Sequence, residues 1–210
     1  LRNQLESTLI SVERDQDRQL VSNAVAECDQ LLATFNALLR IARLEVGSKV
    51  SNFLEFNLSE LVQDAGELYE ALAEDKQQIL LIKIEDNVNI FGDRDLLFQT
   101  LCNLIDNAIK YTPEGGTLVL SLDAMSDEIH LKVSDSGIGI PESERDKVFQ
   151  RFYRVAKSRS LPGNGLGLSL VLAVMDLHHS RVELSDNQPG LSVELIFPKK
   201  MQAGLEYKEA

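Results

Sequence analysis

Tryptophan is absent from this chain of 210 residues, and cysteine, histidine and proline are scarce. The two cysteines and three histidines are scattered, so they cannot form a zinc-type cluster of closely spaced ligands. Two cysteines are also too few for a disulfide scaffold, and they fit small core residues of a reducing compartment. No stretch approaches the roughly 18 apolar residues that span a bilayer. These absences exclude a zinc finger, a disulfide-rich fold and a membrane span within the sequence.

Basic residues are outnumbered by acidic ones, 21 to 33, which gives a net charge of −12 and a pI near 4.7. General nucleic-acid binding requires a basic surface, so the charge argues against that class. Hydrophobic residues make up 44% and charged residues 26%, as in an ordinary folded domain. At roughly 150 residues per domain, the length predicts one to two domains.

Residues 1–50 carry a helical pattern, with one glycine and no proline. Apolar residues recur every seven positions in two interleaved sets, Val21, Cys28, Phe35 and Ala42, and Val25, Leu32, Leu39 and Val46. This repeat predicts a long helix of a helical bundle. Because the helical pattern of residues 1–10 is much shorter, we expect residues 1–50 to form a truncated helical hairpin whose apolar stripe needs a partner.

Helical and β patterns mix from residue 51 onward. Helices are expected at 57–75, 93–111 and 166–177, with Asn57 and Asp93 as N-caps and a short helix after Pro141. The expected strands are 53–56, 78–85, 88–91, 117–122, 128–134, 181–184 and 191–197. This order predicts an α+β fold with a mixed sheet, because strands and helices do not alternate regularly. We expect residues 51–200 to form one domain and 201–210 a polar tail.

One face of the helix expected at 93–111 carries two amides and an ammonium. Asn103 and Asn107 lie four residues apart, and Lys110 follows three residues later. Amide oxygens are hard ligands that suit Mg²⁺, and an ammonium suits phosphate. Taken alone, the same residues also fit an ordinary solvated helix face.

The sequence DSGIGIP at 135–141 follows a β-rich stretch. Gly137 and Gly139 allow the backbone to approach a flat ligand closely. The Asp135 carboxylate only accepts hydrogen bonds, so it suits the amino group of adenine and disfavours the carbonyl of guanine. A tight loop with a capping aspartate is the alternative.

The sequence GNGLGLSL at 163–170 leads into an apolar helix, whose free N–H groups and dipole favour an anion. Its spacing matches neither a P-loop nor the dinucleotide fingerprint. Residues 151–175 contain no acid but four basic residues, Arg151, Arg154, Lys157 and Arg159. Such a segment attracts a polyphosphate and suits a lid, although a flexible connector and a solvated charge run are alternatives.

The order of these motifs resembles that of sensor histidine kinases, the kinases of two-component signal transduction. NLIDNAIKY at 103–111 resembles their N box, DSGIGIP at 135–141 their G1 box, FQRFYR at 149–154 their F box and GNGLGL at 163–168 their G2 box. ALLRIARLE at 37–45 resembles the end of their second dimerisation helix. The resemblance therefore extends over nearly the whole chain.

This resemblance implies a Bergerat-type two-layer α/β sandwich, as in gyrase, the Hsp90 chaperones and MutL, with ATP and Mg²⁺ as cofactors. It implies catalytic roles for Asn107, Lys110 and Arg154, and metal binding by Asn107 and Asn103. The nucleotide-binding residues that it implies are Asn103, Asn107, Lys110, Tyr111, Asp135, Gly137, Gly139, Ile140, Phe152, Gly163, Gly165, Leu166 and Gly167.

The family's phosphoacceptor is a histidine followed by an acid and Leu-Arg-x-Pro-Leu, and no such string is present. We therefore expect the acceptor upstream of residue 1, and ATP binding without autophosphorylation at the normal site. The expected partners are a response regulator and, more weakly without the first helix, a second copy. We expect a cytoplasmic piece of an inner-membrane sensor kinase. The alternatives are an ATPase clamp of the same superfamily and a non-catalytic regulatory module.

Overall fold

The computed structural model describes residues 52–156 and 163–199, together with single positions between 21 and 42. The strands are β1 (Leu54–Asn57), β2 (Ile79–Ile84), β3 (Asn89–Gly92), β4 (Thr117–Ala124), β5 (Glu128–Asp135), β6 (Arg181–Asp186) and β7 (Leu191–Pro198). The α-helices are α3 (Leu58–Asp75), α4 (Arg94–Tyr111) and α5 (Gly167–Leu177). Two short 3-10 helices, η1 (Glu142–Glu144) and η2 (Lys147–Phe149), follow β5.

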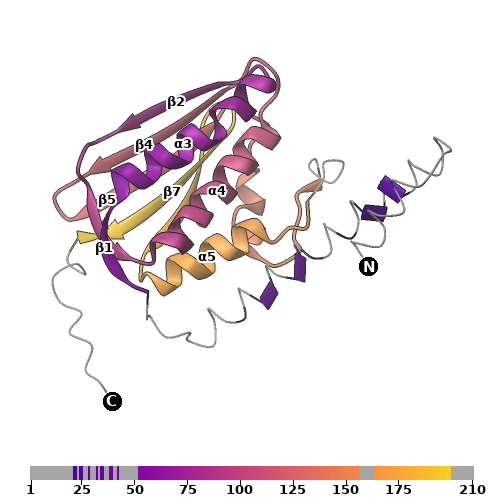
Figure 1. The fold of residues 1–210 in the computed structure, drawn as a ribbon. Helices are drawn as coiled ribbons and strands as arrows, with labels where there is room; N and C mark the ends of the chain where they lie inside the picture. Colours follow the sequence, from indigo (N-terminus) through magenta and orange to yellow (C-terminus); the bar gives the residue numbers. More distant parts are fainter. Residues whose placement is uncertain are drawn as a thin grey trace.

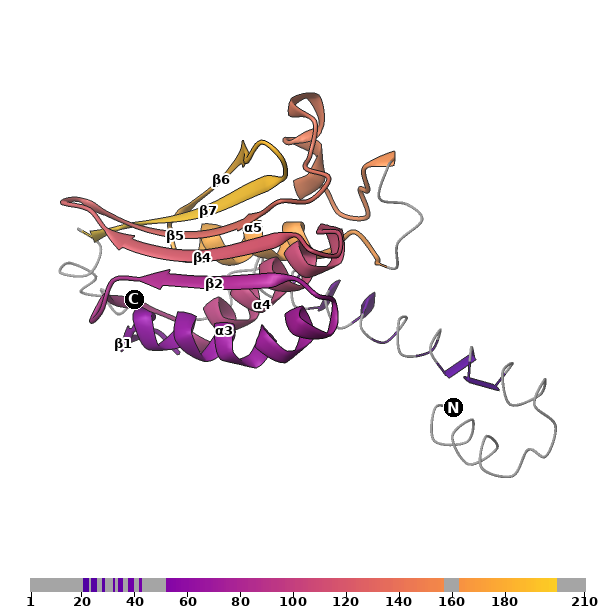
Figure 2. The same cartoon turned by 90° about the horizontal axis from the view of Figure 1, so that it is seen from above.

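Five strands form one sheet in the order β2-β4-β5-β7-β6. Strands β2 and β4 run parallel, and the other neighbouring pairs are antiparallel. Strands β1 and β3 form a separate antiparallel ribbon. Helices α3, α4 and α5 all cover the same face of the sheet (Figures 1 and 2). This two-layer arrangement confirms the predicted α+β fold with a mixed sheet.

The first two of these helices begin at the caps that the sequence predicted. The Asn57 side chain accepts hydrogen bonds from the N–H groups of Ser59 and Glu60 at the start of α3. The Asp93 carboxylate accepts from the N–H of Leu96, 3.0 Å away, at the start of α4. Helix α5 has no side-chain cap, so its first N–H groups remain open to another acceptor.

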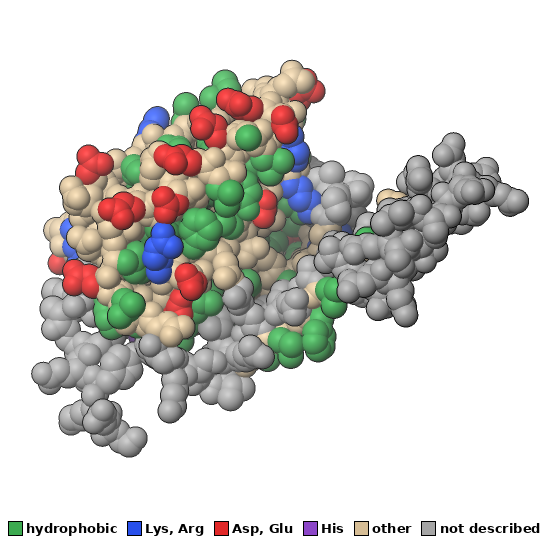
Figure 3. All heavy atoms as spheres, in the orientation of Figure 1, with side chains coloured by type: hydrophobic (Ala, Val, Ile, Leu, Met, Phe, Trp, Pro, Cys, Tyr) green, Lys and Arg blue, Asp and Glu red, His purple; other side chains and the backbone are tan. Residues whose placement is uncertain are grey.

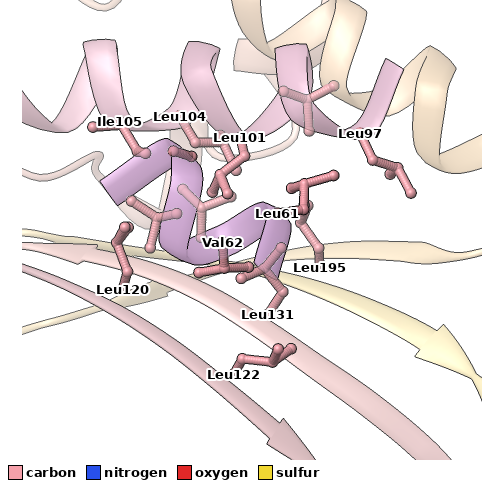
Figure 4. Close-up of a cluster of buried hydrophobic side chains, with 14 of the residues drawn as sticks. Leu61, Val62, Leu97, Leu101, Leu104, Ile105, Leu120, Leu122, Leu131 and Leu195 are labelled. Carbon is pink, nitrogen blue, oxygen red and sulfur yellow. The ribbon is translucent and has the colours of Figure 1, made fainter. Parts of the chain in front are cut away.

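The core lies between the helices and the sheet. Its central side chains are all at most 2% exposed and come from α3, α4 and three strands (Figure 4): Leu61, Val62, Leu97, Leu101, Leu104, Ile105, Leu120, Leu122, Leu131 and Leu195. Each such side chain stabilises the fold by about 1.5–3 kcal/mol relative to an exposed one. Because the apolar side of α4 is buried here, the helix cannot rotate about its axis without losing core contacts.

His178 joins the end of α5 to the start of α4. Its Nε2 accepts a hydrogen bond from the Asp93 N–H at 3.0 Å, and its Nδ1 lies 2.7 Å from the Val174 carbonyl oxygen. The ring stacks on Phe53, with 4.6 Å between centroids. Only the neutral tautomer with a proton on Nδ1 satisfies both bonds. Burial lowers the pKa of His178, which favours this neutral form.

The described positions between 21 and 42 are helical. Three of them on the predicted apolar stripe are exposed, Leu32, Phe35 and Leu39. Residues 1–20, 43–51 and 200–210 lie outside the described part of the chain, so the predicted hairpin and tail stay predictions. None of the helices in the described part is long and apolar enough to traverse a bilayer.

We predict that stability falls on acidification because of His178. Its pKa is lowered in the folded state, so its stabilising contribution is complete above the unfolded pKa of about 6.5 and is lost as the pH falls below it. His178→Phe should lower the unfolding free energy by about 1–3 kcal/mol, because it leaves the partly buried Asp93 N–H without this acceptor. Urea unfolding between pH 5 and 8, with the exposed His179→Asn as control, would check this. An equally steep acid loss in His178→Phe would contradict it.

Candidate active site

A cavity of about 220 Å³ lies between α4, the ends of β5 and β7, and the loop before α5. It brings together most of the predicted site residues: Asn103, Asn107, Lys110, Tyr111, Asp135, Gly139, Ile140, Arg154, Gly163, Gly165 and Gly167. Acidic side chains are scattered over the face of the molecule that carries α3 (Figure 3). The cavity lining contains two basic side chains, Lys110 and Arg154, and two acidic ones, Asp106 and Asp135.

At one end of the cavity, the two amides of α4 face the start of α5. A Cβ added to Gly167 would lie 3.4 Å from Asn107 Nδ2 and 4.0 Å from Asn103 Oδ1. The absence of a side-chain cap leaves the N–H groups of this helix start open. Uncapped N–H groups and the positive end of a helix dipole form an anion site. Asn103 and Asn107 thus lie beside a place suited to phosphate.

Lys110 places a positive charge near the same loop. Its Nζ lies 3.0 Å from the Tyr111 hydroxyl and 4.7 Å from the centre of that ring. A Cβ added to Gly163 would lie 2.7 Å from Nζ. The ammonium therefore reaches from α4 to the first residue of the glycine-rich loop, where a phosphate chain would be neutralised.

The glycine-rich loop is fastened to the segment that follows η2. Arg154 donates from Nη1 to the Gly163 carbonyl at 3.0 Å, and the Phe152 N–H donates to the Gly165 carbonyl at 2.9 Å. Gly165 has a φ of +70°, and a Cβ there would lie 2.8 Å from the Tyr153 carbonyl oxygen. A side chain at position 165 would therefore separate the two segments. The intervening residues 157–162, including Lys157 and Arg159, lie outside the described part.

At the other end, Asp135 closes the cavity as the last residue of β5 and is 7% exposed. Its Oδ1 accepts from the N–H groups of Gly137, at 2.8 Å, and Leu191, at 3.3 Å. Burial raises the pKa of Asp135, and these two bonds oppose the shift. Both bonds end on Oδ1, so Oδ2 keeps its capacity to accept. The surrounding wall is apolar and comprises Val133, Ile138, Ile140, Leu191 and Val193.

Three predicted binding residues do not line the cavity. Gly137 packs against the end of α4, where a Cβ would lie 2.3 Å from the Tyr111 carbonyl oxygen. Leu166 is 1% exposed and belongs to the core. Phe152 is 57% exposed with a φ of 65°, and its neighbour Tyr153 lines the cavity instead. These residues shape the backbone of the site rather than its surface.

The sequence did not indicate several other lining residues. Asp106 lies inside the N-box motif, lines the cavity and interacts with Tyr69 of α3. Burial raises the pKa of both groups, and the Tyr69 hydroxyl opposes the shift at Asp106. Asn164 also lines the cavity, and its Nδ2 donates to Thr34 Oγ1 at 3.1 Å, 130 residues away in sequence. The helical positions between 21 and 42 therefore contact the glycine-rich loop.

Comparisons with known proteins agree with this geometry. Residues 92–201 match the family described as histidine kinase-, DNA gyrase B- and HSP90-like ATPases. The sensor-like histidine kinase SenX3 of Mycolicibacterium smegmatis is 30% identical over 190 residues, covering 89% of this chain and 49% of SenX3. BaeS of Escherichia coli, a signal transduction histidine-protein kinase, is 28% identical over 207 residues, covering 96% of this chain and 44% of BaeS. The chain thus spans about half the length of these relatives.

Among solved structures, the catalytic domain of histidine kinase ThkA is 28% identical with a TM-score of 0.64, covering 70% of this chain and 97% of that domain. The fold and the family match define an ATP-binding domain with the Bergerat fold. The chain belongs to the family of histidine kinase-, DNA gyrase B- and HSP90-like ATPases, and the relatives named above are histidine kinases.

We predict that Asp135→Asn stabilises the fold at neutral pH. Because the folded pKa of Asp135 is raised, its favourable contribution is present at low pH and is lost as the pH rises through that value. An asparagine carbonyl can still accept from Gly137 and Leu191 without a buried charge. Each kcal/mol regained should raise the melting temperature by about 2–4 °C. Thermal unfolding at pH 5 and 8 would measure this, with the exposed Asp186→Asn as control. A lower melting temperature at pH 8 would contradict it.

Proposed function

We propose that this chain positions Mg-ATP for transfer of the γ-phosphate to an acceptor histidine of a dimerisation domain, and that the phosphoryl group then passes to a response regulator. The observation that carries the proposal is the geometry of one cavity, with the Asn103–Asn107 pair and the α5 start at one end and Asp135 at the other. Phosphoryl transfer mainly requires positioning and charge neutralisation, which these groups can supply.

The residues present fit ATP and Mg²⁺. Asn103 and Asn107 offer hard amide oxygens, and within the described part no three His, Cys, Asp or Glu side chains cluster as an alternative metal site. Mg²⁺ usually keeps waters and takes its other ligands from phosphates, so the protein needs to supply only one or two oxygen ligands. When bound, the ion would neutralise charge on the phosphates. A solved structure of the kinase ShkA holds AMPPNP, an ATP analogue, in a chain with a TM-score of 0.77 to this one.

Each of the remaining residues contacts a different part of the nucleotide or supports the site. Asp135 Oδ2 accepts from the adenine amino group, while Gly139 and Ile140 shape the apolar wall beside the base. Lys110 and Arg154 neutralise the phosphates, and Tyr111 lines the ribose side. The N–H groups at the start of α5, beginning with Gly167, bind phosphate oxygens. Gly163 and Gly165 keep the lid backbone close, and Gly137, Phe152 and Leu166 support the site from outside the cavity.

The partners follow from the same assignment. ThkA has been solved in complex with the response regulator protein TrrA, which supports a receiver domain as the final acceptor. The exposed Leu32, Phe35 and Leu39 lie on the predicted apolar stripe and would contact a second copy. We also propose that the parent protein is a sensor kinase of the inner membrane.

We predict that Asn107→Ala weakens Mg-ATP binding by about 10- to 100-fold, because it removes both a ligand and a contact beside the α5 start. The loss should be much smaller when Mg²⁺ is omitted. Isothermal titration with a non-hydrolysable ATP analogue, with and without Mg²⁺, would measure it. Gln99→Ala removes an amide from the same helix outside the cavity and serves as the control. Unchanged Mg²⁺ dependence in Asn107→Ala would argue against the metal assignment.

Transfer itself is tested by adding a separate dimerisation domain that carries an acceptor histidine, together with γ-labelled ATP. We expect acid-labile label on the added domain, and none when that histidine is replaced by glutamine. ATP turnover without labelling would favour the clamp ATPase. A folded chain that binds no ATP would favour the non-catalytic module.

A further inference from the structure

The turn between β6 and β7 lies against the base end of the cavity. The Asn187 Nδ2 donates to the Asp135 carbonyl oxygen at 2.8 Å, across 52 residues of sequence. The Leu191 N–H donates to the carboxylate of the same aspartate at 3.3 Å. The turn therefore holds both the backbone and the side chain of the residue that would read the base.

Close packing brings the turn to this position. A Cβ added to Gly190 would lie 1.8 Å from the Asp135 carbonyl oxygen and 2.9 Å from the Gly137 nitrogen, and its φ is +111°. The Gly190 carbonyl also closes the turn, because it accepts from the Asn187 N–H at 3.2 Å. Only glycine at position 190 leaves room for the turn to pack this closely against Asp135. The close packing brings the Asn187 amide within hydrogen-bond distance of the Asp135 carbonyl.

The bond from Asn187 replaces a missing strand contact. The β5–β7 pairing ends at Ser134 and Ser192, one residue before Asp135. On the other side, β4 still pairs with Asp135 through Leu118. Asp135 therefore has a strand neighbour on one side only, and on the other side its carbonyl is held by the Asn187 side chain. This bond fixes the peptide group between Asp135 and Ser136, next to the Cα that carries the carboxylate.

We propose that Asn187 is a positioning residue for base recognition, acting through Asp135 without touching the nucleotide. This inference rests on the proposed function. A hydrogen bond weakens steeply as its angle departs from linearity, so a tilt of the Asp135 peptide would reduce the bond from the adenine amino group. Contacts to the phosphates, at the far end of the cavity, would not change. Loss of Asn187 therefore lowers selectivity for the base more than overall nucleotide affinity.

The experiment compares ATP with inosine triphosphate, which has a carbonyl oxygen in place of the adenine amino group. Asp135 can accept a hydrogen bond from the adenine amino group, whereas hypoxanthine presents an acceptor oxygen at that position. For Asn187→Ala we expect ATP affinity to fall about 5- to 10-fold, the worth of one hydrogen bond, with inosine triphosphate affinity within twofold of the parent. Asn187→Asp keeps the shape but presents an oxygen to the carbonyl, so its loss should be larger. Displacement of a fluorescent ATP analogue would give both affinities.

Gln188→Ala is the matched control, because this exposed residue lies in the same turn and does not line the cavity. It should keep the parent's ratio of ATP to inosine triphosphate affinity. Variants of Asn187 that keep that ratio would overturn this inference and leave the proposed function intact. An equal loss for both nucleotides, with a lower melting temperature, would show a structural role only and would also overturn it. A folded parent chain that binds no ATP would overturn both proposals.

Discussion

The fixed orientation of α4 is the constraint on which the site depends. Its apolar side is buried against α3 and the sheet, which determines where Asn103, Asn107 and Lys110 lie. Both ends are also tied to distant parts of the chain. At the start, His178 accepts from the N-cap residue Asp93, and at the end, the Gln78 side chain donates to the carbonyls of Ile109 and Thr112. A helix held along its side and at both ends can present small amide groups without a loop to position them.

The end of the cavity that Asp135 closes follows a different principle. Asp135 is buried as a carboxyl group, which costs stability when it ionises, and it is supported by backbone N–H groups rather than by a cation. A neighbouring Lys or Arg would occupy the Asp135 carboxylate, which has to stay available if it is to accept a hydrogen bond from a base amino group. Two N–H bonds to Oδ1 offset part of the cost and leave Oδ2 available. The fold thus retains an unfavourable group where a neutral one would be more stable, which is typical of binding sites.

Local interactions are the part that the sequence could predict. The N-caps Asn57 and Asp93, the extent of the helices and the shared face of Asn103 and Asn107 depend on residues within one or two turns. The mixed sheet followed from the order of elements. Membership of a motif was less informative, because it could not distinguish residues that line the cavity from residues that shape the backbone. Phe152, Gly137 and Leu166 lie in the motifs yet outside the lining.

Contacts between distant segments could not be predicted from the sequence. Neither Asn187 nor Thr34 stands in a pattern that indicates its partner, since each bond depends on how the sheet closes or how the helices pack. Tyr69 is a similar case, because its position in a helical repeat fits a core residue as well as a partner for Asp106. A hydrogen bond between distant segments produces no periodic pattern in the sequence, whereas burial of a helix face produces a periodic pattern of apolar residues.

The Asn164 side chain shows how such a contact can link two distant parts of the chain. Its Nδ2 donates to Thr34, and its Oδ1 accepts from the Leu166 N–H at 3.3 Å, just before the first turn of α5. One amide therefore joins the helical positions between 21 and 42 to the place where phosphate would bind. A ligand shifts an equilibrium only by its difference in affinity for the two states. Phosphate that favours one arrangement of this loop would change the bond to Thr34 only if that bond also differs between the two arrangements.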